Sequence, residues 1–94
     1  MLLKPDETDL IGRWVLEENR VLGDPMTERI ERLVSDYLEE IADVYYGWEI
    51  LYRDPQDGRY WELTYPQSAM HGGGPPRLTC LPKKQAVEKY HLSG

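Results

Sequence analysis

The sequence predicts one α+β domain, in which a small, mostly antiparallel sheet of about four strands packs on one long amphipathic helix, with a short helix near the C-terminal end. Three observations lead to this class: a helical apolar stripe after "DP", two aromatic runs around "DPQDG", and a chain of only 94 residues. A chain of this length rarely carries two hydrophobic cores. We therefore expect residues 1–94 to form a single domain.

The first predicted strand lies near residues 11–18, where "LIGRWVLE" is short and rich in apolar residues. The segment "ENRVLG" is then expected to turn the chain. Asp24 followed by Pro25 is typical of a helix start, because Asp caps free N–H groups and Pro at the first helical position has no N–H to leave unpaired.

The helix predicted after this cap is expected to end before Gly47. Its apolar residues recur at spacings of three, four and one, which places them on one face of a helix. These residues are Met26, Ile30, Leu33, Val34, Tyr37, Leu38 and Ile41.

A β-hairpin is predicted next. The runs "WEILYR" (48–53) and "RYWELTY" (59–65) are aromatic and β-branched, and "DPQDG" between them suits a tight turn. Asp54 is expected to cap this turn and Gly58 to supply a left-handed residue. The acidic residues here do not match the spacing of an EF-hand calcium loop.

The remaining chain alternates between irregular and regular patterns. The stretch 66–76, "PQSAMHGGGPP", is predicted to be a loop, and "RLTCL" (77–81) a short strand. Pro82 is expected to start a final helix, "KKQAVEKYHL", with Ala86, Val87 and Tyr90 as its apolar face.

The composition narrows the functional classes. The net charge is −6, and it is concentrated in residues 1–47, which carry 12 acidic and 5 basic side chains. The negative electrostatic potential of these residues disfavours binding to nucleic acid and favours a basic partner. The chain shows no signal-peptide or membrane-spanning pattern, so we expect a cytoplasmic protein without a membrane partner.

Metal and cofactor sites are not predicted. Cys80 is the single cysteine, so an internal disulfide is excluded, and the two histidines show no recognisable zinc spacing with it. We expect neither a cofactor nor a metal.

The string around His71, "HGGG", resembles the oxyanion-hole sequence of some lipases. No G-x-S-x-G nucleophile elbow accompanies it, and Pro75 and Pro76 replace the helix start that a phosphate loop requires. The glycines are therefore expected mainly to shape the chain, although His71 could contact a partner. The alternative hypothesis is a small hydrolase or ligand-binding domain centred on this loop.

An acidic stripe is predicted on the last turns of the long helix, formed by Asp36, Glu40 and Asp43. Carboxylates at a helix C-terminus, and like charges four residues apart, each cost a few tenths of a kcal/mol or more. A surface that disfavours folding is a candidate for selection by a charged partner. We hypothesise that these residues bind a basic protein.

The aromatic residues supply a second indication of binding. The chain has seven Tyr, three Trp and no Phe, and these side chains are enriched at protein interfaces. Trp14, Trp48 and Trp61 are expected in the core. Tyr60 and Tyr65, together with His71, are candidate contacts with a partner.

A family resemblance agrees with this interpretation. Residues 47–78, "GWEILYRDPQDGRYWELTYPQSAMHGGGPPRL", with "DLIGRW" at 9–14 and "KY" at 89–90, resemble the immunity protein 27 family of bacterial polymorphic-toxin systems. The resemblance implies a small cytoplasmic bacterial protein, not an enzyme, that binds and neutralises a cognate toxin domain by stoichiometric inhibition. The charge favours a basic toxin, such as a nuclease.

Overall fold

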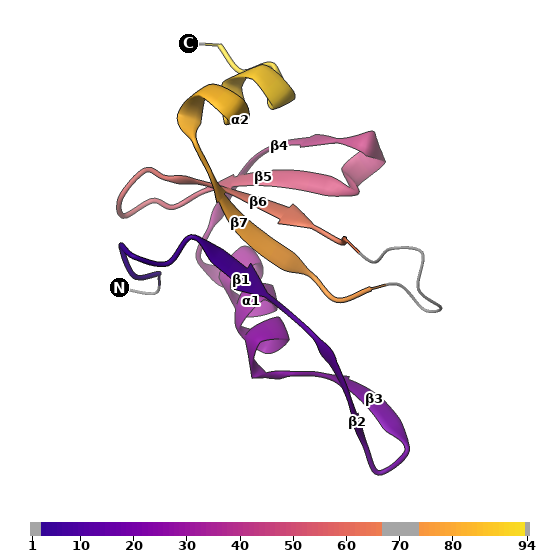
Figure 1. Ribbon diagram of the computed structural model, residues 1–94. Coiled ribbons are helices and arrows are strands. Elements are labelled where there is room, and N and C mark those ends of the chain that lie inside the picture. The colour runs from indigo at the N-terminus through magenta and orange to yellow at the C-terminus, as the bar shows by residue number, and fades with distance from the viewer. Residues whose placement is uncertain (1–2, 67–73, 94) are drawn as a thin grey trace.

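The computed structural model describes residues 3–66 and 74–93. A five-stranded antiparallel sheet in the order β1-β7-β6-β5-β4 forms its centre, and a separate hairpin, β2-β3, projects from one end (Figure 1). Its strands are β1 (Asp9–Ile11), β4 (Glu39–Val44), β5 (Glu49–Arg53), β6 (Tyr60–Thr64) and β7 (Arg77–Leu81). The α+β class and the mostly antiparallel sheet are confirmed, whereas the expected count of about four strands is too low.

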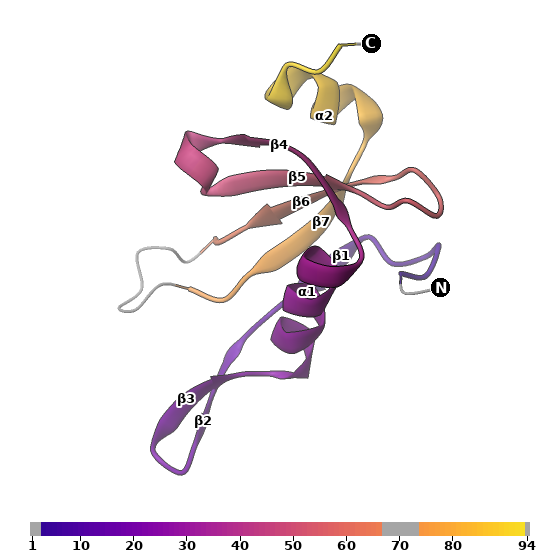
Figure 2. The same cartoon turned by 180° about the vertical axis from the view of Figure 1, so that it is seen from behind.

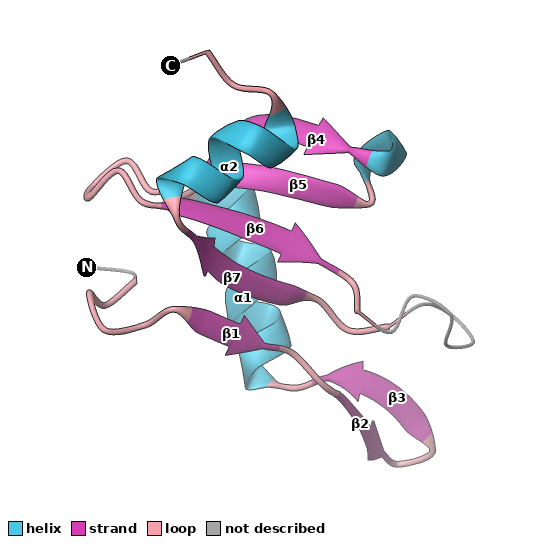
Figure 3. Cartoon of the chain, turned by 45° about the horizontal axis from the view of Figure 1, so that its top comes forward, coloured by secondary structure: helices cyan, strands magenta, loops and turns pink. Residues whose placement is uncertain are grey.

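The two helices lie on opposite faces of the sheet. Helix α1 (Pro25–Asp36) covers one face, and α2 (Lys83–Tyr90) covers part of the other, as Figure 3 shows from the side of α2. Each helix buries its own cluster. In the first cluster, Ile30 and Leu33 of α1 pack with the sheet residues Tyr52, Trp61, Leu63 and Leu78. In the second, Ala86 and Tyr90 of α2 pack with Leu51 of β5.

Helix α1 starts as predicted, because the Asp24 carboxylate accepts a hydrogen bond of 2.7 Å from the Thr27 N–H and Pro25 is the first helical residue. It ends ten residues earlier than predicted. After Asp36 the chain leaves the helix through Tyr37, and the Leu38 N–H donates to the Leu33 carbonyl at 2.7 Å. Residues 39–44 form β4 instead.

The charges of residues 36–43 explain why the helix ends at Asp36. A helix continued through residues 36–43 would hold two like-charged pairs four residues apart beside its partially negative end. As an edge strand, β4 places Glu39 and Glu40 in water without that repulsion. The apolar spacing alone suggested a helix, since Leu38 and Ile41 continue the stripe.

The first predicted strand is also corrected. Residues 11–18 do not form one strand, because β1 ends at Ile11 and β2 (Trp14–Glu17) belongs to the hairpin. β2 turns through Glu18 and Asn19, both with positive φ, and pairs with β3 (Arg20–Gly23). Two central residues with positive φ match the twist of a two-residue hairpin.

The second hairpin and the last helix follow the prediction. β5 and β6 flank the "DPQDG" turn, where Asp54 Oδ1 accepts from the Gln56 N–H at 2.8 Å and Gly58 has φ +78°. Pro82 precedes α2, which buries Ala86 and Tyr90. Of the predicted loop 66–76, the described residues carry no helix or strand, and residues 67–73 lie outside the described part.

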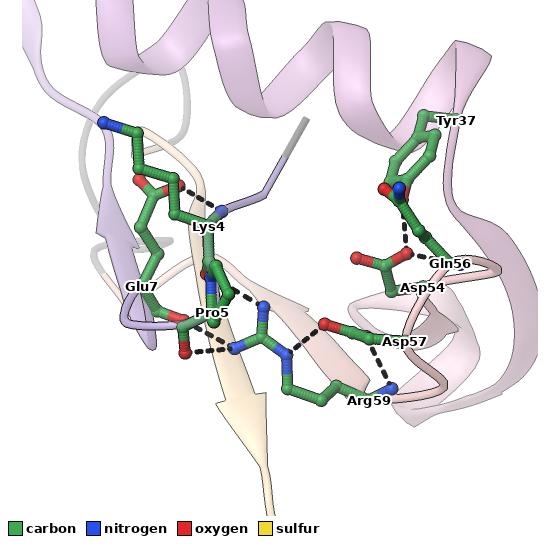
Figure 4. A network of polar contacts seen from close by, with 8 residues as sticks. All are labelled: Lys4, Pro5, Glu7, Tyr37, Asp54, Gln56, Asp57 and Arg59. Atoms are coloured by element: carbon green, nitrogen blue, oxygen red, sulfur yellow. Dashed lines mark hydrogen bonds and ion pairs between the residues drawn. The ribbon is translucent and has the colours of Figure 1, made fainter. Parts of the chain in front are cut away.

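Arg59 fixes the N-terminal segment to this turn (Figure 4). Its guanidinium donates to the carbonyls of Lys4 and Glu7 at 3.0 and 2.8 Å and pairs with Asp57 at 2.7 Å. The same group lies 5.0 Å from the centre of the Trp61 ring. One side chain thereby joins residues more than fifty positions apart.

Buried Asp54 joins the same turn to the end of α1. Its Oδ1 accepts a hydrogen bond from the Tyr37 hydroxyl (Figure 4). Burial, reinforced by this bond to Asp54, raises the pKa of Tyr37 to about 12. The Tyr37 hydroxyl therefore stays protonated and donates to the carboxylate at neutral pH.

Candidate partner-binding surface

Part of the sheet face that carries α1 remains uncovered. α1 packs against β1, β3 and β7, so the ends of β4, β5 and β6 that lie furthest from it are left open (Figure 2). Carboxylates and aromatic rings gather on this open part and along its border with α1. We call this region the acidic–aromatic face and define it by Glu31 of α1 together with Glu40, Asp43, Trp48 and Tyr65. Tyr52, which pairs with Glu40, is itself buried.

A β-bulge determines which carboxylates reach this face. In the pairing of β4 with β5, Glu40 lies opposite Tyr52 and Asp43 opposite Ile50, with the register shifting between Glu40 and Ala42. Directly paired residues share a face, and Tyr52 and Ile50 both pack on the α1 side. The bulge therefore brings Glu40 and Asp43 to one face, although an odd spacing of three would separate them in a regular strand.

The electrostatics show that the acids and tyrosines are close. Burial raises the pKa of Tyr52, and the charges of Glu40 and Tyr65 raise it further. Burial likewise raises the pKa of Tyr65, with a second contribution from the Glu31 charge. Negative charges beside a phenol disfavour its ionisation, so both hydroxyls remain donors at neutral pH.

Trp48 completes the face. Its ring makes an edge-to-face contact with Tyr65, with 6.5 Å between the ring centres, yet its side chain is 61% exposed. The expectation that Trp48 lies in the core is therefore wrong. Trp61 is fully buried as expected, and Trp14 is partly buried.

A strained corner adjoins the face. The short 3-10 segment η1 (Tyr45–Gly47) has positive φ at all three residues, 55°, 58° and 88°. Only Gly adopts this left-handed backbone conformation without a steric penalty, which is roughly 1 kcal/mol for each tyrosine. Both tyrosine side chains project outward, and that of Tyr46 is fully exposed.

The predicted contact residues separate into groups. Glu40, Asp43 and Tyr65 come together on the acidic–aromatic face. Glu40 and Asp43 lie on β4 and Tyr65 directly follows β6, so the helical stripe that was expected does not exist. Asp36 lies at the end of α1 and lines a different hollow, with Arg29, Arg32 and Tyr37.

Tyr60 lies on the opposite face of the sheet from Tyr65, where it packs beneath α2 against Leu51 and Tyr90. This contact gives it a place in the second core cluster. His71 lies outside the described residues. Sequence reasoning missed Glu31 and Trp48 as members of the face, because Glu31 joins it through the path of α1 across the sheet and Trp48 through its contact with Tyr65.

The α2 side holds a closed polar cluster rather than an open surface. Lys89 Nζ lies 2.5 Å from Glu49 and 2.7 Å from Glu62, and the Tyr90 hydroxyl donates to Glu62 at 2.7 Å. Burial, with the bond to Glu62, raises the pKa of Tyr90. These contacts hold α2 on the sheet.

A hollow of about 490 Å³ lies beside the base of the β2-β3 hairpin, lined by Ile11, Gly12, Arg13, Trp14, Pro66, Pro75, Pro76 and Arg77. Among the lining residues that the structure describes, none carries a carboxylate, thiol, hydroxyl or imidazole, and Arg77 is paired with Asp9 at 2.7 Å. Within residues 3–66 and 74–93, no group of three His, Cys, Asp or Glu side chains is arranged to hold a metal.

Comparison with known families decides the assignment. Residues 16–82 match the family model described as Immunity protein 27, which is well over half of the chain. This chain belongs to the immunity protein 27 family. No curated protein sequence and no solved structure matches it.

Family membership confirms the resemblance seen in the sequence and makes the chain an immunity protein directed against a toxin. The matched residues run from β2 through β7, so they include every member of the acidic–aromatic face. In the described part of this immunity protein 27 member, no helix is long and apolar enough to cross a membrane.

Proposed function

We propose that this immunity protein neutralises its cognate toxin by stoichiometric binding, and that the acidic–aromatic face receives a basic surface of the toxin domain. The observation that carries the proposal is that three carboxylates, two on β4 and one on α1, share one side of the molecule with Tyr65 and the exposed Trp48. A basic toxin, such as a nuclease, fits this charge.

The carboxylates of the face are not used by the fold. Within the described residues, five other acids form ion pairs: Glu7, Asp9, Glu49, Asp57 and Glu62. Glu31, Glu40 and Asp43 form none there. Their negative charge is therefore available to steer a basic partner, since opposite fields accelerate diffusional encounter.

The aromatic side chains supply the short-range part of the interaction. Trp48 and Tyr65 have apolar rings with polar donors, a combination that recurs in binding hot spots. The strained η1 corner keeps Tyr45 and Tyr46 exposed at the border of the face. Backbone strain of this kind persists where the surrounding structure or a function maintains it.

We propose that inhibition requires no chemical step on this chain. The rival is a hydrolase or ligand-binding domain centred on His71. His71→Ala separates the two. Unchanged protection of cells against the cognate toxin would remove the rival, and turnover of a substrate that the variant loses would support it.

The deciding experiment is charge reversal at two positions. Glu40→Lys with Asp43→Lys is expected to lower the association rate constant with the purified toxin domain by about tenfold or more at low salt. Asp36→Lys is the matched control, because Asp36 is an exposed acid away from the face. Association rates that are equal in the double variant and the wild type would contradict the proposal.

A further inference from the structure

The β2-β3 hairpin forms an apolar arm that stands away from the sheet and α1 (Figures 1 and 2). We call residues 14–23 the hairpin arm. Leu16 and Val21 face each other across the hairpin and are 73% and 66% exposed. Val15 and Leu22 form the second such pair, on the other face, and are 41% and 36% exposed. Both faces of the arm therefore present aliphatic side chains to water.

The base of the arm is firmly held. The Thr27 hydroxyl, which is buried at the start of α1, accepts from the Arg13 N–H at 3.0 Å and lies 3.2 Å from the Arg13 carbonyl. The Asp24 N–H also donates to that carbonyl, at 3.0 Å. At Gly12, a Cβ atom would approach Thr27 Oγ1 to 2.5 Å, so the chain passes too close for any larger residue. The arm is thus a fixed projection.

A two-stranded hairpin is marginally stable in water, and three or more strands with a shared apolar face are needed for independent stability. Each hairpin edge is also a template for another strand. Four strands of the described chain have a free edge: β1 and β4 in the large sheet, and β2 and β3 in the arm. β1 is only three residues long, and β3 carries Arg20 with no acidic residue within the strand that a second copy could place opposite it. β4 carries a bulge and the carboxylates of Glu39, Glu40 and Asp43, which repel an identical strand. β2 is mostly apolar.

The charges at the two ends of β2 favour its pairing with β2 of a second copy. When two copies of β2 pair antiparallel about a two-fold axis at Val15, Arg13 of one copy lies opposite Glu17 of the partner subunit, and the reverse contact is equivalent. Both side chains are exposed in the isolated chain. Two-fold pairs are the commonest symmetric assemblies, and their contacts are self-complementary in this way.

We infer that a second copy of this chain docks on the hairpin arm, pairing β2 with β2 to form a four-stranded sheet across a two-fold dimer. The dimer closes the free edge of β2, places Leu16 opposite Trp14 of the partner subunit, and leaves the acidic–aromatic face of each copy open. This inference is independent of the proposed function, because its test requires no toxin.

The first test measures the oligomeric state of the full chain by sedimentation velocity over a wide concentration range. A concentration-dependent dimer is expected. Leu16→Glu should weaken dimerisation by about tenfold or more, because a carboxylate replaces the apolar cross-strand contact with Trp14 of the partner subunit at two equivalent positions. Ile41→Glu, at an exposed aliphatic residue of β4, is the control and should leave the dimer intact. Circular dichroism checks that both variants fold.

The second test exploits the charge register. Arg13→Glu and Glu17→Arg should each weaken the homodimer, and mixing the two variants should restore a mixed dimer, since both cross-subunit pairs then join opposite charges. Val15→Cys in a Cys80→Ser background should form a reducible dimer on mild oxidation, because an antiparallel pair at the axis brings the two Cα atoms within disulfide range. Ile41→Cys in the same background should not.

Two results would overturn the inference. One is a wild-type chain that stays monomeric at every concentration. The other is a dimer that survives Leu16→Glu and shows no rescue on mixing the charge variants. If the monomeric chain loses toxin affinity on Leu16→Glu, the hairpin arm belongs to the toxin interface instead. Loss of the dimer with normal toxin binding would uphold the dimer and leave the proposed function unaffected.

Discussion

Glu40 and Asp43 point to the same face of β4 although only two residues separate them, because the bulge between Glu40 and Ala42 takes one residue out of the alternation. The paired strand places Glu40 opposite Tyr52 and Asp43 opposite Ile50, and both of these partners pack on the α1 side. Two carboxylates three positions apart on an edge strand are thereby presented as one charged patch.

This patch predicts a specific salt dependence. The association rate constant of the wild type with the toxin domain should fall steeply as ionic strength rises, since salt screens exposed charges beyond about 10 Å at 0.1 M. The variant Glu40→Gln with Asp43→Gln should show a flatter dependence, measured by stopped-flow or surface plasmon resonance. Parallel slopes for the two proteins would contradict a role for these charges in encounter.

Trp48 is expected to contribute affinity rather than stability. Trp48→Ala should weaken toxin binding by about 2 kcal/mol, the range of an interface hot spot, and leave the thermal midpoint nearly unchanged. Calorimetric titration and thermal unfolding measure the two effects. Trp61→Ala provides the contrast, because loss of this fully buried ring should cost about 3 to 5 kcal/mol of unfolding free energy.

Arg59 is expected to hold the N-terminal segment. Arg59→Ala removes its hydrogen bonds to the carbonyls of Lys4 and Glu7 and its position over Trp61, and should lower the free energy of unfolding by about 2 kcal/mol. Hydrogen exchange should accelerate first in residues 3–11. Arg53→Ala, at an exposed arginine of β5, should leave the exchange of that segment unchanged.

Glu7 predicts a defined acid sensitivity. A hydrogen bond from Arg29 lowers the pKa of the folded Glu7 carboxyl to about 2 from its usual 4.5. The stabilisation of the folded state by the Glu7–Arg29 ion pair is therefore complete above pH 4.5 and is lost as the pH falls towards 2. It amounts to about 1 kcal/mol, because the pair is partly exposed.

The measurement is the thermal midpoint as a function of pH. Glu7→Gln should lower stability at neutral pH and flatten its decline between pH 4.5 and 2. Glu88→Gln, at an exposed acid of α2, is the control and should follow the wild-type curve. A wild-type decline that Glu7→Gln leaves unaltered would contradict this assignment.

The parts of the fold that depend on neighbouring residues could be predicted from the sequence. The Asp24-Pro25 helix start, the turn at Asp54 and Gly58, and the helix after Pro82 each follow from local chemistry. The end of α1 could not be read from hydrophobic spacing, because Leu38 and Ile41 continue the helical stripe into an edge strand. The unfavourable charges of residues 36–43 were the better guide.

The candidate surface was predicted only in part, for a different reason. Glu40, Asp43 and Tyr65 were identified as binding residues, and the charge and aromatic content pointed to them. Their companions Glu31 and Trp48 join them through the path of α1 across the sheet and through the bulge in β4. Such long-range placement leaves no trace in residue spacing.

The pairing of β1 with β7 bears on the order in which the chain folds. Leu10 meets Leu78, a partner 68 positions later, whereas β5 and β6 meet across a short turn. Closing a long loop costs more chain entropy than closing a short one, so the β5-β6 hairpin is expected to form early and β1 last. A growing chain on the ribosome therefore leaves β1 without its strand partner until residues 77–79 have emerged.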